Sequence, residues 1–247
     1  MSKIAKVTTF FWVMKICATT LGETAGDLLS MTMDVGYGVS SLILLGLFLV
    51  SVVGQLNAAK FHPTLYWTVI LTTSTAGTTM SDFMDRTLGL GYATGSAILI
   101  ASLLATLGIW RVTEKSLSVS DIKTPRAEMF YWAAILCSNT LGTALGDFLA
   151  DDSGLGFAGG AVLIGGLLVL VLVAYFGSRI DRVLLFWVAF VLTRPFGATF
   201  GDLLTKPIAK GGLNLGTLGS SSVLAVILIA CVFWTHRQEQ AVKPSGG

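Results

Sequence analysis

Four copies of one polar motif, each closed by an aspartate, constrain the fold of this chain more than any other feature. Each copy opens with an aromatic residue followed by tryptophan, and all four align without a gap from tryptophan to aspartate. The aromatic pairs are Phe11-Trp12, Tyr66-Trp67, Tyr131-Trp132 and Phe186-Trp187, and the closing aspartates are Asp27, Asp82, Asp147 and Asp202. An internal repeat of this length predicts that every copy builds the same structural unit.

The spacing of the repeats divides the chain into two similar halves. The aspartates lie 55, 65 and 55 residues apart (82 − 27, 147 − 82 and 202 − 147), so a unit of two repeats recurs after 120 residues. The ten additional residues in the middle fall between the second and third copies. We expect a first half at 1–112, a cytoplasmic linker at 113–127, a second half at 128–236 and a disordered cytoplasmic tail at 237–247.

The composition indicates a membrane protein with several spans. Hydrophobic residues make up 53% of the 247 residues and charged residues 12%, with a mean hydropathy of +0.78, whereas about a quarter of a soluble domain is charged. Four stretches, 35–59, 87–110, 153–178 and 211–235, contain no charge. Each is long enough to cross about 30 Å of hydrocarbon as a helix. With the four equally long motif stretches, they predict an all-α protein with eight transmembrane helices.

The basic residues are distributed unevenly between the two expected sides of the membrane. Of sixteen Lys and Arg, eleven fall on the side that holds both termini, three on the other side (Arg86, Lys206 and Lys210) and two inside spans (Lys15 and Arg194). By the positive-inside rule, both termini are cytoplasmic. The uneven distribution indicates that the basic residues orient the spans in the membrane. We therefore expect membrane lipid as a partner and no nucleic acid.

The repeat also determines how the spans are arranged. Because two spans return the chain to its starting side, all four copies have the same orientation, as parallel repeats related by rotation about the membrane normal. We expect the motif helices, spans 1, 3, 5 and 7, to surround a central axis. The uncharged helices then lie outside and face lipid. Because the N-terminal apolar segment is the first copy of the repeat, we do not expect it to be a cleaved signal peptide.

Each motif helix has a polar face and a neighbouring face of small residues. Residues at i, i+4 spacing stack along one face of a helix. The polar faces are Lys15, Thr19, Glu23 and Asp27; Ile70, Ser74, Thr78 and Asp82; Ile135, Asn139, Thr143 and Asp147; and Phe190, Arg194, Ala198 and Asp202. The glycines of the small faces are Gly22, Gly26, Gly77, Gly142, Gly146, Gly197 and Gly201. Small residues let membrane helices approach closely, so we expect the small faces to pack and the polar faces to point into the centre.

The polar faces predict a cation-binding centre. We expect its oxygen ligands to come from Glu23, Asp27, Asp82, Asp147, Asp202, Thr19, Ser74, Asn139 and Thr143, with the four aspartates as the metal ligands. Placing a charge inside the membrane costs at least about 2.5 to 3.5 kcal/mol of insertion free energy. A purely structural role for all four aspartates is therefore unfavourable. Five acids against two intramembrane bases predict a net negative centre. Oxygen ligands suit Mg, Ca or Mn better than zinc or copper.

Two bases break the symmetry of the repeats. Arg194 stands where the other copies have Thr, Ser or Asn, and Lys15 has no basic counterpart. We hypothesise that both tether acidic residues and exchange partners during transport. A fixed buried ion pair needed for folding is the alternative. Pro195 lacks an N–H and is expected to kink or break its helix.

The chain resembles a bacterial family of uncharacterised membrane-anchored proteins made of tandem two-helix repeats of unknown function. The resemblance rests on a Gly-x-x-x-Gly-Asp ending, found at Gly22, Gly26 and Asp27; Gly77, Ser81 and Asp82; Gly142, Gly146 and Asp147; and Gly197, Gly201 and Asp202, with Ser81 as the one departure. It covers nearly all spans. It implies a multi-pass protein of the bacterial inner membrane, and it brings no settled substrate.

The first functional hypothesis is a transporter, not an enzyme, that moves a divalent cation such as Mn or Mg along the central axis. The alternative is a pseudo-fourfold cation channel, because the sequence from Thr20 to Glu23 resembles a filter. A third hypothesis is an intramembrane aspartyl protease with paired carboxylates. We expect no cofactor, because the transported cation is the substrate. The sequence contains no phosphate-binding loop, so we do not expect a nucleotide-driven pump. The sequence leaves homo-oligomer formation and the direction of transport open.

Overall fold

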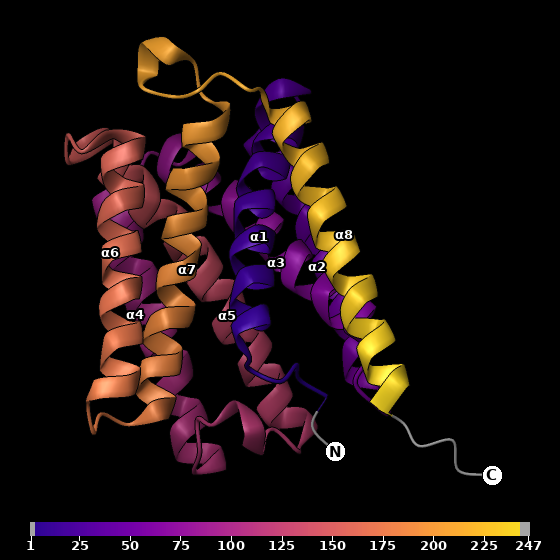
Figure 1. The fold of residues 1–247 in the computed structure, drawn as a ribbon. Coiled ribbons are helices and arrows are strands. Elements are labelled where there is room, and N and C mark those ends of the chain that lie inside the picture. Colours follow the sequence, from indigo (N-terminus) through magenta and orange to yellow (C-terminus); the bar gives the residue numbers. More distant parts are fainter. Residues whose placement is uncertain (1–2, 243–247) are drawn as a thin grey trace.

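The computed structural model describes residues 3–242, which are all-helical apart from the loops (Figure 1). The eight long helices are α1 Thr9–Asp27, α2 Tyr37–Asn57, α3 Pro63–Asp82, α4 Tyr92–Glu114, α5 Pro125–Asp147, α6 Gly156–Gly177, α7 Arg182–Thr205 and α8 Thr217–Val242. A short 3₁₀ turn, Val119–Asp121, lies in the linker, and a second, Ile208–Lys210, lies between α7 and α8. Helix α8 continues past the predicted end of the second half at 236, and 243–247 of the predicted tail lie outside the described residues.

Local sequence explains where the motif helices begin. The side chains of Thr8, Thr124 and Asp181 each accept a hydrogen bond from a backbone N–H three residues further on, which caps α1, α5 and α7. Pro63 and Pro125 occupy the first helical positions of α3 and α5. There the missing N–H removes no helical hydrogen bond.

Beyond the motif aspartates, the first three motif helices continue as π-helical turns. These turns are Leu28–Thr32, Phe83–Thr87 and Phe148–Asp152. The fourth motif helix, α7, remains α-helical to Thr205. The sequence interpretation ended all four helices at their aspartates. Because the helical path continues, a side chain about one turn later lies close to the aspartate.

Helix α7 runs without interruption through Pro195, so this proline does not break the helix. The proline ring lies against Gly142 of α5, where a Cβ would come within 2.9 Å of the proline Cδ. Neighbouring helices can support a proline within a membrane helix. Pro195 is therefore part of the contact between α5 and α7.

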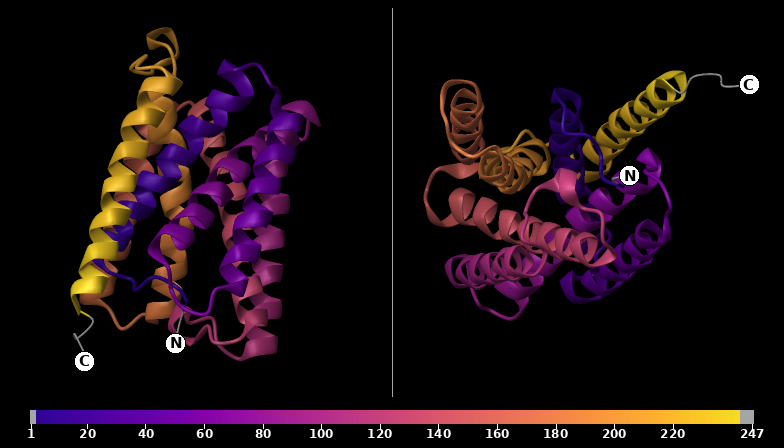
Figure 2. Two further views of the ribbon diagram at one scale, coloured as in Figure 1. Left: turned by 90° about the vertical axis from the view of Figure 1, so that its right-hand side faces the viewer. Right: turned by 90° about the horizontal axis from the view of Figure 1, so that it is seen from below.

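The four motif helices pack in a closed ring, seen from one end in the right panel of Figure 2. Helix α1 packs on α3, α3 on α5, α5 on α7, and α7 on α1. The aromatic ring of each repeat contacts the tryptophan of the next, with centroid distances of 5.7, 5.6, 6.3 and 5.7 Å for Phe11–Trp67, Tyr66–Trp132, Tyr131–Trp187 and Phe186–Trp12. These contacts close the ring from the fourth repeat to the first, around one end of the axis.

Glycine makes the close approach of the motif helices possible. A Cβ added to any of the seven motif glycines would lie 3.0 Å or less from an atom of a neighbouring motif helix. Gly22 faces Ser74, for example, and Gly197 faces Thr19. Each repeat thus presents its glycine face to the polar face of the next repeat.

The four uncharged helices pack around this ring. Each lies on the motif helix of the following repeat: α2 on α3, α4 on α5, α6 on α7, and α8 on α1. Six helices, α2 and α4 to α8, are long and apolar enough to cross a membrane. Within their most apolar windows, α2, α4, α6 and α8 are only 22–28% buried, against 67% for α5. This pattern identifies a helical membrane protein whose motif helices form the interior.

Candidate cation-binding centre

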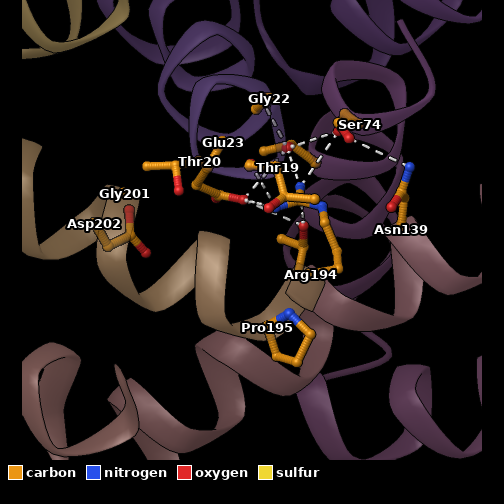
Figure 3. Close-up of polar contacts among 12 residues, drawn as sticks. Thr19, Thr20, Gly22, Glu23, Ser74, Asn139, Arg194, Pro195, Gly201 and Asp202 are labelled. Carbon is orange, nitrogen blue, oxygen red and sulfur yellow. Dashed lines mark hydrogen bonds and ion pairs between the residues drawn. The ribbon is translucent and has the colours of Figure 1, made fainter. Parts of the chain in front are cut away.

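Arg194 lies at the centre of the ring and contacts all three other motif helices (Figure 3). The side chain is completely buried, and Nη1 lies 3.0 Å from Oε2 of Glu23 on α1. The Nη2 group donates to the hydroxyls of Thr78 on α3 and Thr143 on α5, at 2.5 and 2.7 Å. A single guanidinium therefore links the four motif helices.

Glu23 is the counterion of Arg194. Its Oε2 atom also accepts hydrogen bonds of 3.3 Å from the hydroxyls of Thr78 and Thr143. Each hydroxyl can thus accept from the guanidinium and donate to the carboxylate. A buried ion pair needs such additional hydrogen bonds to offset the loss of water.

Lys15 lies on the same axis but pairs with no carboxylate among the ion pairs that the described residues form. Its Nζ atom lies 3.4 Å from Oδ1 of Asn139 and 4.1 Å from the centroid of the Phe190 ring. The structure therefore shows Lys15 without a carboxylate partner among the described residues, and its role in partner exchange stays a prediction. A cation–π contact and one long hydrogen bond hold the ammonium instead.

Three of the predicted oxygen ligands are used in contacts between helices. The Thr19 hydroxyl donates to the carbonyl of Thr193 on α7, at 3.1 Å. The Asn139 amide donates to the hydroxyls of Thr73 and Ser74, at 2.8 and 3.3 Å. These polar groups stabilise the ring and do not converge on the carboxylates.

Arg86 holds two of the motif aspartates at the end of the ring opposite the aromatic contacts. Its Nε lies 3.1 Å from Oδ1 of Asp82, and its Nη2 lies 3.0 Å from Oδ2 of Asp147. The aspartates belong to α3 and α5, so the arginine bridges the two halves of the chain.

Lys206 makes the equivalent bridge on the other side of the ring. Its Nζ lies 2.5 Å from Oδ2 of Asp27 and 3.1 Å from Oδ1 of Asp202. Lys206 follows the last residue of α7. Burial lowers the pKa of its amine, but the carboxylates of Asp202 and Asp27 raise it by more, so the pKa lies above its ordinary value. The amine is therefore a permanent cation at neutral pH.

These two bridges correct the predicted charge of the centre. The sequence interpretation assigned Arg86 and Lys206 to the outer loops and counted five acids against two bases. With both included, four bases face five acids, an excess of one negative charge when all are ionised (4 − 5 = −1). The signal that could have found them is the i, i+4 spacing from Asp82 to Arg86 and from Asp202 to Lys206, a spacing that brings opposite charges together on a helix.

Three buried carboxylates come close enough to share one ion. Glu23 on α1, Asp147 on α5 and Asp202 on α7 each place one oxygen so that the three oxygens lie within 4.8 Å of one another. Two oxygens bound to opposite sides of a Mg²⁺ or Ca²⁺ ion are about 4 to 5 Å apart. Among the described residues, Asp27 and Asp82 are not part of this group. We call Glu23, Asp147 and Asp202 the carboxylate cluster.

Comparison with known protein families identifies the family of these repeats. Four segments match the family described as Repeat of Unknown Function (DUF347), at residues 10–61, 65–116, 130–181 and 185–241. Their starting residues are 55, 65 and 55 apart (65 − 10, 130 − 65 and 185 − 130), the spacing of the motif aspartates. The chain matches no curated protein and no solved structure. The four matches cover most of the chain and confirm the resemblance inferred from the Gly-Asp endings, so this protein belongs to the DUF347 family of repeats of unknown function.

Proposed function

We propose that this protein is a membrane transporter that moves a divalent cation such as Mn²⁺ or Mg²⁺ along the axis of the ring. The observation that carries the proposal is the carboxylate cluster, in which three motif helices each supply one buried acid. Carboxylate oxygens are suitable ligands for both ions. A divalent cation would also offset the cost of burying any of these carboxylates that its own basic partner releases.

The proposal requires all eight long helices to cross the membrane. Helices α1 and α3 fall outside the six that are apolar enough to span alone. Both lie in the ring, however, and pack against two other motif helices and an outer helix, so little of their polar surface faces lipid. Helix α1 begins and α8 ends at the same end of the bundle (Figure 1). By the positive-inside rule we propose that this end is cytoplasmic, and that the membrane is a bacterial inner membrane.

The barriers along the axis favour a transporter over a channel. On one side of the carboxylate cluster the completely buried guanidinium of Arg194 lies across the axis. On the other side, Arg86 and Lys206 bridge the aspartates. A continuous ion path would require these groups to move. We propose that Arg194 releases Glu23 when the inner side opens. The salt bridges also disfavour an aspartyl protease, in which two carboxylates share a proton.

Binding of Mn²⁺ to the purified full-length protein tests the proposal. Millimolar Mn²⁺ should raise the thermal unfolding midpoint of the wild type, since a ligand at a hundred times its Kd stabilises by about 2.7 kcal/mol. Asp147→Asn and Asp202→Asn should abolish this shift, and Asp82→Asn should reduce it less, because Asp82 lies outside the cluster. Asp34→Asn, which neutralises an exposed loop carboxylate, is the control.

Transport by reconstituted protein decides between the functions. Mn²⁺ uptake into liposomes should saturate and should require the carboxylate cluster, and bilayer recordings should show no single-channel currents. Single-channel currents would support the channel instead. A Mn²⁺ shift that survives in Asp147→Asn and in Asp202→Asn would contradict a central cation site altogether.

A further inference from the structure

We propose that Arg86 and Lys206 are tethered counter-cations that compete with the transported ion for the aspartates, and that this competition selects divalent over monovalent cations. The inference rests on the proposed function, because it concerns the same carboxylate cluster. It assigns a selective role to two residues at the outer end of the ring.

The first observation is that every member of the carboxylate cluster is bound to one basic side chain. Glu23 pairs with Arg194 at 3.0 Å. Asp147 pairs with Arg86 at 3.0 Å, and Asp202 pairs with Lys206 at 3.1 Å. An ion that binds all three carboxylates must therefore displace, or share them with, three positive charges that belong to the protein.

The second observation is that the two outer bases occupy equivalent positions of the two halves. Both follow their motif aspartate by four residues, and they are 120 residues apart (206 − 86), the offset between the halves. The first and third repeats have Met31 and Asp151 at this position. Two bases therefore serve four aspartates, and each base binds one aspartate from its own half and one from the other half, namely Asp147 for Arg86 and Asp27 for Lys206.

The physical reason for selection is the charge of the competitor. A tethered ammonium or guanidinium faces its carboxylate at an effective concentration of about millimolar or more. The side chains of Arg86 and Lys206 are only 29% and 17% exposed, so salt screens their ion pairs weakly. Na⁺ carries the same charge as the tethered group and gains no Coulomb advantage over it. A divalent ion interacts twice as strongly with each carboxylate at the same distance and can displace it.

The test is the affinity of the full-length protein for Mn²⁺, with and without excess Na⁺, in Lys206→Gln and Arg86→Gln. Each substitution should tighten Mn²⁺ binding about tenfold, because one competitor is removed. Excess Na⁺ should then weaken Mn²⁺ binding in these variants but not in the wild type. Lys210→Gln, in the exposed part of the same outer loop, makes the same charge change and should leave both properties unchanged.

Conservative variants separate charge from shape. Lys206→Arg and Arg86→Lys keep the tethered charge and should retain wild-type Mn²⁺ affinity. The two bases give independent variants, so the test survives if one of them does not fold. Unchanged Mn²⁺ affinity in a folded glutamine variant of either base, with binding still dependent on Asp147, would overturn the inference and leave the proposed function standing. A wild type that binds no divalent cation would refute the proposed function itself.

Discussion

At the scale of single residues, Arg194 depends on a glycine supplied by the preceding repeat. A Cβ on Gly142 would lie 2.3 Å from Cγ of Arg194 and 2.5 Å from its Cβ. The guanidinium then reaches across the ring to Glu23 and the two threonine hydroxyls. A side chain of this size can therefore occupy the axis because the motif leaves room beside it.

Replacing Arg194 should destabilise the protein strongly. In Arg194→Gln the carboxylate of Glu23 stays buried without its counterion, and breaking one side of a buried pair costs about 3 to 5 kcal/mol. Adding Glu23→Gln should recover part of this loss, since the unpaired charge is removed. Unfolding in mixed micelles measures both values.

The same variants test whether the pair is mechanistic. If the double variant is no more stable than the sum of its single variants predicts, the two side chains do not act as an ion pair. If folded Arg194→Gln transports Mn²⁺ at the wild-type rate, the guanidinium does not exchange partners during transport.

At the scale of elements, contact between motif helices depends on the absence of a side chain at a few positions. A Cβ on Gly22 of α1 would lie 2.3 Å from the Cβ of Ser74 and 3.0 Å from its backbone carbonyl carbon on α3. The backbone of α3 cannot yield without disturbing its contact with α5. Gly46 on the outer helix α2, by contrast, has no atom within 4 Å of an added Cβ.

We therefore expect Gly22→Ala and Gly46→Ala to have different effects. Overpacking of a close contact costs about 1 to 3 kcal/mol, so Gly22→Ala should lower the thermal midpoint. Gly46→Ala should leave the midpoint unchanged or raise it, because alanine favours the helical state over glycine. Equal midpoints for the two variants would mean that α1 and α3 are not in tight contact.

The sequence predicted the helices better than it predicted the centre. Charge-free lengths and the repeat period place the eight helices correctly, because both follow from local composition. The period also makes Asp27, Asp82, Asp147 and Asp202 look equivalent, whereas the cluster takes two of them together with Glu23. That choice depends on how helices distant in the sequence meet. The roles of Arg86 and Lys206 were missed because the helical path continues beyond the aspartates as π-helical turns or as further α-helix.

At the scale of the whole molecule, the two halves are joined at both ends of the ring. The Arg86 and Lys206 bridges join them at the aspartate end. At the other end the hydroxyls of Tyr66 and Tyr131 lie 2.7 Å apart, and Lys3 pairs with buried Glu128 at 2.6 Å. Movement of one half against the other therefore has to break polar contacts at one end of the ring or at both.

Single-cysteine labelling in whole cells tests whether α1, which falls outside the six helices apolar enough to span alone, crosses the membrane. In a background without Cys17, Cys137 and Cys231, a membrane-impermeant thiol reagent should label Met33→Cys from outside, and Lys60→Cys only after permeabilisation. Both residues are exposed in loops at opposite ends of the bundle. With the cytoplasmic N-terminus proposed above, a helix α1 that does not cross would reverse these two results, since α2 alone would then separate the residues from the N-terminal side.

A ring closed by four equivalent repeats could also be built from separate chains. Each outer helix packs on the motif helix of the next repeat, and α8 returns to α1, so four separate two-helix chains could form the same ring as a tetramer of identical subunits. In that tetramer, any axial residue would be present four times. Four guanidiniums at the position of Arg194 would repel one another with no water to screen them. A chain in which the four repeats are joined avoids this repulsion, because each repeat can change alone and a single axial arginine can pair with a single glutamate.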